Sequence, residues 1–123
     1  MKPLVLLVDD DVAIRDGLAE LLETEGYDVA TAMDGGEALE IMRGGFRPNV
    51  IVLDLLMPGI DGWDFRVAQL ENGQIADIPV VVISASGFSA ETVKPQLGVN
   101  DYFKKPLDTE RFVSALNRVA ASA

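Results

Sequence analysis

The stretch Asn-Val-Ile-Val-Leu-Asp-Leu-Leu-Met-Pro-Gly-Ile-Asp-Gly, residues 49–62, decides the fold class of this chain. Its first five residues form a short run rich in β-branched side chains, which favours a strand covered on both faces. The run ends at Asp54, and the following Pro58 and Gly59 stop the strand and force a turn. Asp54 is therefore predicted at the carboxyl end of a buried strand, where open α/β sheets bind ligands.

Short runs of this kind recur along the chain and alternate with helical patterns. Strands are expected at residues 4–8, 27–32, 49–53, 79–83 and 101–104. Helices are expected at residues 12–24, 37–43, 63–71 and 89–97, and from Asp108 onward. Pro95 is expected to keep the fourth helix short or distorted, because proline lacks a backbone donor. Five strands alternating with five helices predict an α/β fold, in which a parallel sheet has helices on both faces.

Composition narrows the classes of function. The 123 residues, 49% of them hydrophobic, suit one domain spanning residues 1–123. A formal charge of −10 disfavours direct binding to nucleic acid, because phosphates would be repelled. The absence of cysteine and histidine excludes disulfides, thiolate nucleophiles, imidazole bases and the usual zinc sites. The apolar run before Asp9 is too short for a signal peptide or a membrane span, which predicts a cytoplasmic protein without membrane insertion.

Polar residues follow the predicted strands at points that a parallel sheet brings to one edge. They are Asp9 and Asp10 after the first strand, Asp54 after the third, Ser84 after the fourth and Lys105 after the fifth. Each has an ordinary structural explanation when taken alone, as a cap, a turn residue or a solvated lysine. The joint pattern instead predicts one crevice that contains all five side chains.

The chemistry of such a crevice follows from its charges. Three neighbouring carboxylates repel one another unless a cation compensates them, and oxygen ligands without His or Cys suit Mg²⁺. With a divalent cation and the Lys105 ammonium neutralising a phosphoryl group, an oxygen of Asp54 could attack phosphorus in line. Ser84 could donate a hydrogen bond to another phosphoryl oxygen. The residues therefore predict a Mg²⁺-dependent phosphoacceptor site.

Four segments together resemble the receiver domains of two-component response regulators. They are Leu-Leu-Val-Asp-Asp-Asp at residues 6–11, Asp-Leu-Leu-Met-Pro-Gly-Ile-Asp-Gly at 54–62, Val-Val-Ile-Ser-Ala at 81–85 and Tyr-Phe-Lys-Lys-Pro at 102–106. The resemblance covers essentially the whole chain. It implies a flavodoxin-like, doubly wound five-stranded parallel sheet in the strand order 2-1-3-4-5 with five helices.

The resemblance also implies roles for individual residues. Asp54 would be the phosphorylation site, and it would take the phosphoryl group from a histidine of a sensor kinase or phosphotransfer protein. Mg²⁺ would be bound by Asp10 directly, by Asp9 through water, and by Asp54 and the backbone carbonyl of Leu56. Lys105, across a cis bond to the following proline, would pair with the phosphoryl oxygens.

Ser84 and Tyr102 resemble the switch pair of the family, in which the hydroxyl follows the phosphate inward and the ring fills the space behind it. Ser84 stands where many relatives carry Thr, which keeps the hydroxyl. Leu56 and Ser86 flank the acceptor at positions where relatives vary. Phosphorylation is expected to switch a partner-binding surface whose target the sequence does not name. The protein would catalyse its own phosphorylation and dephosphorylation at Asp54, unlike a conventional metabolic enzyme.

Other classes of protein fit this sequence less well. A phosphatase of the haloacid dehalogenase type could use Asp9 as nucleophile and Asp11 as general acid. That reading lacks a Gly-Thr after the acids and a later acidic pair for the metal, and the chain is short for that fold. A flavin-binding module would need a phosphate loop where three acids stand. A receiver that acts only as a docking surface would not need every charged position that is present here.

The sequence leaves several properties open. It does not name the kinase or the target, and it does not give the oligomeric state or the lifetime of the acyl phosphate. No output domain follows the final predicted helix, so the chain would either act on a partner in trans or belong to a longer protein.

Overall fold

The computed structural model describes residues 2–85 and 87–122, and their ten elements alternate strictly between strand and helix. The strands are β1 (Leu4–Val8), β2 (Asp28–Ala32), β3 (Val50–Asp54), β4 (Val80–Ser84) and β5 (Asp101–Lys104). The helices are α1 (Val12–Thr24), α2 (Gly35–Arg43), α3 (Gly62–Glu71), α4 (Ala90–Leu97) and α5 (Thr109–Ser122). All ten predicted elements are therefore present, with ends that differ by at most two residues from the predicted ranges.

The five strands form one parallel sheet in the order β2-β1-β3-β4-β5, as predicted. The strand order reverses between β1 and β3: the chain passes from β1 to β2 on one side of β1, and β3 then lies on the other side. Such a reversal separates the loops that follow the two strands and leaves a crevice at their carboxyl ends. Asp9 follows β1 and Asp54 ends β3, so both acids lie at this reversal.

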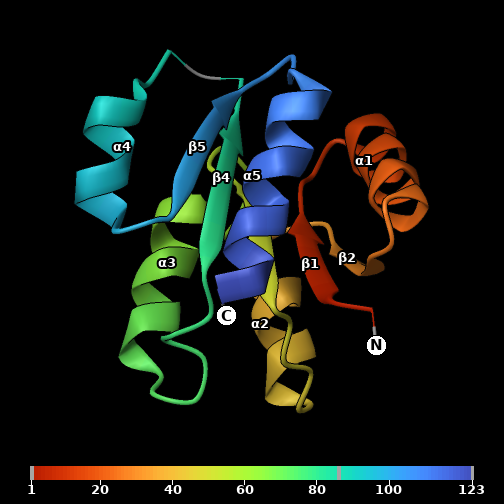
Figure 1. Cartoon of the computed structure of the whole chain (residues 1–123). Helices are drawn as coiled ribbons and strands as arrows, with labels where there is room; N and C mark the ends of the chain where they lie inside the picture. Colours follow the sequence, from red (N-terminus) through yellow and green to blue (C-terminus); the bar gives the residue numbers. More distant parts are fainter. Residues whose placement is uncertain (1, 86, 123) are drawn as a thin grey trace.

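The core has two layers because successive strand residues point to opposite faces of the sheet. On one face, Leu6 and Val8 of β1 pack in a cluster with buried side chains of α2, α3 and α4. On the other face, Val5 and Leu7 pack with side chains of α1 and α5. Figure 1 shows this division, with α1 and α5 on one side of the sheet and α3 and α4 on the other. The strands are apolar throughout because both of their faces are covered.

The fourth helix is short, as its proline predicts. α4 has eight residues with Pro95 inside it, and Ser89 caps its start by accepting a hydrogen bond from the N–H of Thr92. Its end at Gly98 adopts the left-handed conformation, with φ of 64°, that glycine tolerates best. The helix is continuous through Pro95 and ends at Leu97, before Gly98.

A buried arginine holds the end of α4 against α3. The guanidinium of Arg66 donates hydrogen bonds to the backbone oxygens of Leu97 at 2.9 Å and Gly98 at 3.0 Å. It also donates to the side-chain oxygen of Gln69, whose amide nitrogen donates to the backbone oxygens of Ile75 and Ile78. Burial lowers the pKa of Arg66. The positive charge lies at the negative end of the α4 dipole, which stabilises this position of the helix.

Candidate functional site

Asp9 is held rigidly where β1 ends. Its side chain is 0% exposed, and its backbone N–H donates to the carbonyl of Ala32 at 3.1 Å. One carboxylate oxygen, Oδ1, accepts from the N–H of Asp11 at 2.9 Å. The guanidinium of Arg15 donates to the backbone oxygen of Asp9 at 2.9 Å, a contact that the sequence reasoning missed. Asp10, the next residue, is exposed, so its carboxylate remains accessible to solvent.

Asp54 is the last residue of β3 and only 4% of it is exposed. Its Oδ1 accepts a hydrogen bond of 3.3 Å from the N–H of Leu56. The loop after Asp54 folds back closely: a Cβ atom at Gly62 would lie 2.6 Å from the backbone oxygen of Asp54. Only glycine allows α3 to begin this near to the strand end. The N–H of Leu56 contacts the site in this structure, and its carbonyl as a metal ligand stays a prediction.

Lys105 links the ends of the first and third strands. Its Nζ lies 2.7 Å from Oδ2 of Asp9 and 3.3 Å from Oδ2 of Asp54, and its side chain is largely buried. The backbone N–H of Lys105 donates to the carbonyl of Ser84 at 2.8 Å, and its peptide bond to Pro106 is cis, as expected. The ammonium is therefore fixed between two carboxylates from distant parts of the chain.

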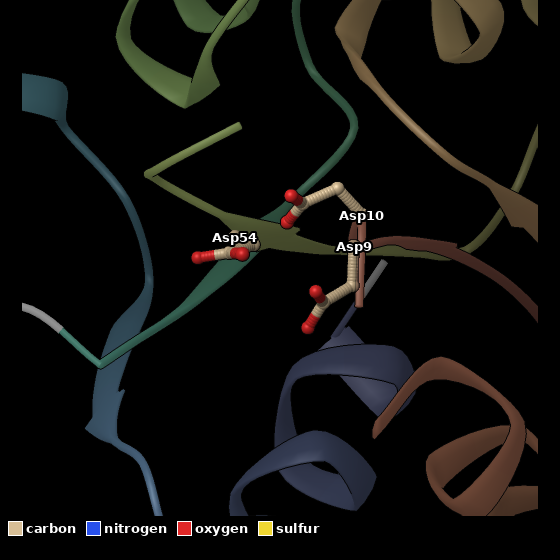
Figure 2. A group of neighbouring side chains, drawn as sticks. All are labelled: Asp9, Asp10 and Asp54. Carbon is tan, nitrogen blue, oxygen red and sulfur yellow. The ribbon is translucent and has the colours of Figure 1, made fainter. Parts of the chain in front are cut away.

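Three carboxylates meet at this edge of the sheet. One oxygen atom from each of Asp9, Asp10 and Asp54 can be chosen so that all three lie within 4.8 Å of one another. Figure 2 shows these side chains gathered where β1 and β3 end. With one ammonium among them, three ionised carboxylates leave an excess of negative charge. An all-oxygen cluster of this kind fits a hard divalent cation such as Mg²⁺ better than a softer metal.

The environment of the site raises the pKa of Asp54 to about 6. Burial is the main cause, since it disfavours the charged form, and the nearby Asp9 carboxylate adds to it. Lys105 and the N–H of Leu56 act in the opposite direction but do not cancel the rise. For Lys105, burial alone lowers the pKa, yet the Asp9 and Asp54 carboxylates outweigh it and raise the pKa. A further cation would favour the ionised form of Asp54.

Ser84 and Tyr102 lie on neighbouring strands behind the acids. Ser84 ends β4 and is fully buried, beside Lys104 in the register of β5. Tyr102 is also buried, and its hydroxyl donates to the backbone oxygen of Phe88 at 2.6 Å. The ring therefore points inward beneath the segment between β4 and α4. Of the two residues predicted to flank the acceptor, Leu56 is exposed and Ser86 lies outside the described residues.

Phe88 makes contacts that the sequence did not predict. Its ring meets that of Trp63 edge to face, with centroids 5.6 Å apart, so it joins the β4–α4 segment to the start of α3. No local pattern marks Phe88, because Trp63 and Tyr102 are more than ten residues away along the chain.

Asp11 does not take part in the cluster. Its carboxylate accepts from the N–H of Ile14 at 3.2 Å and caps the start of α1. A general acid at Asp11, required by the phosphatase interpretation, would have to leave this cap. The structure therefore gives Asp11 a structural role.

Comparisons with known proteins agree on one family. The sequence model described as the response regulator receiver domain matches residues 5–117. The chain is 36% identical over 115 residues to the DNA-binding dual master transcriptional regulator RpaA of Synechocystis sp., covering 91% of this chain and 46% of RpaA. It is also 36% identical over 117 residues to the response regulator MprA of Mycobacterium tuberculosis, covering 94% of this chain and 50% of MprA. The chain thus spans about half the length of these curated relatives.

Solved structures give the same result. A response regulator receiver protein from Pseudomonas putida superposes with a TM-score of 0.87 at 28% identity, covering 96% of this chain and 98% of that one. The chemotaxis protein CheY4 of Vibrio cholerae has a TM-score of 0.87 at 31% identity, covering 97% and 99%. None of these matches supports a haloacid dehalogenase phosphatase. In the described part of the chain, residues 2–85 and 87–122, no helix is long and apolar enough to cross a bilayer.

Proposed function

The chain belongs to the response regulator receiver domains of two-component systems, and from this membership we propose that Asp54 is its phosphoacceptor. The observation that carries the proposal is the position of the Lys105 ammonium within 2.7 Å of Asp9 and 3.3 Å of Asp54. This contact holds a cation beside the acid that would accept the phosphoryl group. It is supported by the raised pKa of Asp54, about 6, which is caused first by burial and then by the neighbouring Asp9 carboxylate.

The proposed reaction is a transfer of a phosphoryl group between two proteins. An oxygen of Asp54 forms a bond to phosphorus while the P–N bond of a partner's phosphohistidine breaks, and the imidazole leaves with the electron pair and takes a proton from solvent. Lys105 would bind phosphoryl oxygens and stabilise their charge. Mg²⁺ would be bound by Asp10, Asp54 and the carbonyl of Leu56, and by Asp9 through water, and it would neutralise the remaining phosphoryl charge.

Ser84 and Tyr102 are proposed to carry the signal from the acceptor. Ser84 would donate a hydrogen bond to a phosphoryl oxygen, and Tyr102 would adjust its packing beneath the β4–α4 segment. The hydrogen bond from Tyr102 to the backbone of Phe88 supports a link between this ring and that segment. Phosphorylation would thus shift the equilibrium between two surface conformations, which a partner protein distinguishes.

The phosphodonor is proposed to be a sensor histidine kinase or a histidine phosphotransfer protein. The downstream target is proposed to be a protein, because the excess of negative charge disfavours direct contact with nucleic acid. RpaA is described as DNA-binding, and the chain matches less than half of it. Residues 1–123 are proposed to act as one phosphoacceptor domain in the cytoplasm.

The test is incorporation of a phosphoryl group from acetyl phosphate, measured by intact-protein mass spectrometry. We expect a single phosphoryl increment in the presence of Mg²⁺, and none with EDTA or in Asp54→Asn. Asp11→Asn serves as the matched control and is expected to be phosphorylated normally. Retention of the label in Asp54→Asn, or its loss in Asp11→Asn alone, would contradict the assignment.

A further inference from the structure

The outward face of α3 has an unusual distribution of side chains. Arg66 and Gln69 point inward, where Arg66 is 7% and Gln69 0% exposed, whereas Val67 is 54% and Leu70 50% exposed. A helix packed on a sheet normally places its apolar residues inward and its polar residues outward. The inward polar residues are explained by their hydrogen bonds to the end of α4 and to the loop after α3. Core packing does not explain the outward apolar ones.

These apolar side chains form a continuous surface. Trp63, Val67 and Leu70 are four and three residues apart, so they follow one stripe along the helix. Phe88, 37% exposed, extends the stripe at its amino-terminal end through its edge-to-face contact with Trp63. We call Trp63, Val67, Leu70 and Phe88 the α3 surface. Single exposed apolar residues are common, whereas apolar side chains gathered on one surface are typical of interaction sites.

The exposed charged side chains of α3 itself all have one sign. Asp64 and Glu71 are exposed on the same helix, and the basic residue of α3, Arg66, is buried. Each of the other four helices has a basic side chain that is at least partly exposed: Arg15, Arg43, Lys94 and Arg111. The α3 surface is therefore an apolar stripe bordered by carboxylates without a neighbouring exposed cation on its helix.

We propose that the α3 surface binds an amphipathic helix of a partner protein, whose apolar face covers the stripe and whose Lys or Arg residues pair with Asp64 and Glu71. The complementary charge and the helical spacing of the stripe both favour this occupant. A second copy of this chain is disfavoured, since a symmetric contact would bring the same carboxylates together. Nucleic acid and anionic membranes are disfavoured because their phosphates would meet Asp64 and Glu71.

The proposal does not depend on phosphorylation of Asp54 and is tested on the unmodified chain. The probe is a short synthetic helical peptide with Leu on one face and Lys on the other, and a peptide with Glu in place of Lys is the control. Binding is followed by Trp63 fluorescence and located by NMR shifts of backbone amides. We expect the largest shifts at residues 63–71 and at Phe88, and no saturable binding of the acidic peptide.

Two pairs of matched variants distinguish peptide binding at the α3 surface from a general response to the negative charge of the protein. Val67→Gln is compared with Val12→Gln, which alters a residue that is 58% exposed on α1. Asp64→Asn with Glu71→Gln is compared with Glu20→Gln and Glu23→Gln, which remove the same two charges from α1. Circular dichroism checks that each variant is folded, and Leu70→Gln replaces Val67→Gln if that variant is not.

We expect the α3 variants to weaken binding of the basic peptide by about fivefold or more, and the α1 variants by less than about twofold. Equal weakening by the two charge pairs would show a response to net charge alone and overturn the proposal. It would also be overturned by shifts centred on Asp9, Asp10 and Asp54, or by equal binding of the acidic peptide. Failure of phosphorylation at Asp54 would leave these outcomes unchanged.

Discussion

At the scale of single residues, the site depends on balancing charges that the sheet has buried together. Asp9 and Asp54 are almost fully enclosed, and Lys105 is the cation that contacts both of them. Buried charges are costly unless they are paired, and removing one partner of a buried pair costs more than the pair contributes. The acids and the lysine therefore determine stability as well as the proposed chemistry.

The raised pKa of Asp54 predicts a pH-dependent gain in stability for Asp54→Asn. Because its pKa is about 6 in the folded state and 3.8 ordinarily, the native protein holds a proton that the unfolded chain releases as the pH rises. Ionised Asp54 thus destabilises the fold progressively between these values, and the penalty is constant above the higher one. In EDTA at neutral pH, Asp54→Asn should raise the free energy of unfolding by about 3 kcal/mol.

Urea denaturation at a series of pH values measures this difference. The gain should nearly vanish below the ordinary pKa of 3.8 and grow until the pH exceeds the folded value. Asp77→Asn, which neutralises an exposed acid outside the site, is the control and should change stability little. A gain that is the same at all pH values would contradict the explanation from burial.

Lys105→Ala should destabilise the protein. Its removal leaves the carboxylates of Asp9 and Asp54 buried together without a cation, so we expect a loss of about 3 kcal/mol at neutral pH in EDTA. Saturating Mg²⁺ should restore part of the loss, because it supplies the missing positive charge. The exposed neighbour Lys104→Ala is the control. Equal stability of the two variants in urea denaturation would show that the buried pair is not important.

At the scale of secondary-structure elements, α4 is held at both ends by contacts from elsewhere. Its carboxyl end accepts hydrogen bonds from Arg66 of α3, and the segment before it accepts one from Tyr102 of β5. With eight residues and an internal proline, α4 would be marginal as an isolated helix. Its position therefore depends on these tertiary contacts.

Arg66→Met should destabilise the protein and release the end of α4. Methionine retains the apolar stem, but it leaves the carbonyls of Leu97 and Gly98 without their charged donor, at a cost of about 2 kcal/mol. Hydrogen exchange should become faster at the amides of the last turn of α4 and of Gly98. Arg118→Met on α5, whose side chain is largely exposed, should have little effect on either measurement. Unchanged exchange in α4 would show that Arg66 does not hold it.

At the scale of the whole molecule, the net charge of −10 acts against the compact state. The chain has twenty acids and ten bases, and most of them lie on a surface of 6286 Å². The exposed carboxylates therefore repel one another over distances at which salt screens them. This repulsion is separate from the site, where the buried charges lie within direct contact of Lys105.

We expect NaCl, raised from low to physiological concentration in EDTA, to increase the free energy of unfolding by up to about 1 kcal/mol through screening. Glu20→Gln with Glu23→Gln makes the net charge two units less negative and should reduce this dependence on salt. Urea denaturation at several NaCl concentrations provides the measurement. A stability that falls with added salt would show that attractive pairs outweigh the repulsion.

The sequence by itself determined the order of the elements, the parallel sheet and the edge at which Asp9, Asp10, Asp54, Ser84 and Lys105 lie. These follow from local patterns: β-branched runs predict buried strands, Pro and Gly end them, and parallel topology brings their carboxyl ends together. The caps at Asp11 and Ser89 have the same local origin, because each bonds to an N–H three residues ahead.

Only the tertiary structure decided which side chains touch. Lys105 pairs with Asp9 and Arg66 anchors the end of α4, and each of these contacts joins residues that are distant in sequence. The contact of Arg15 with the backbone of Asp9 and the outward position of Val67 and Leu70 are likewise set by packing. Helical spacing alone favours Val67 and Leu70 as core residues and Arg66 as a surface residue. Burial is decided by the neighbours that a helix packs against, and those neighbours exist only once the chain has folded.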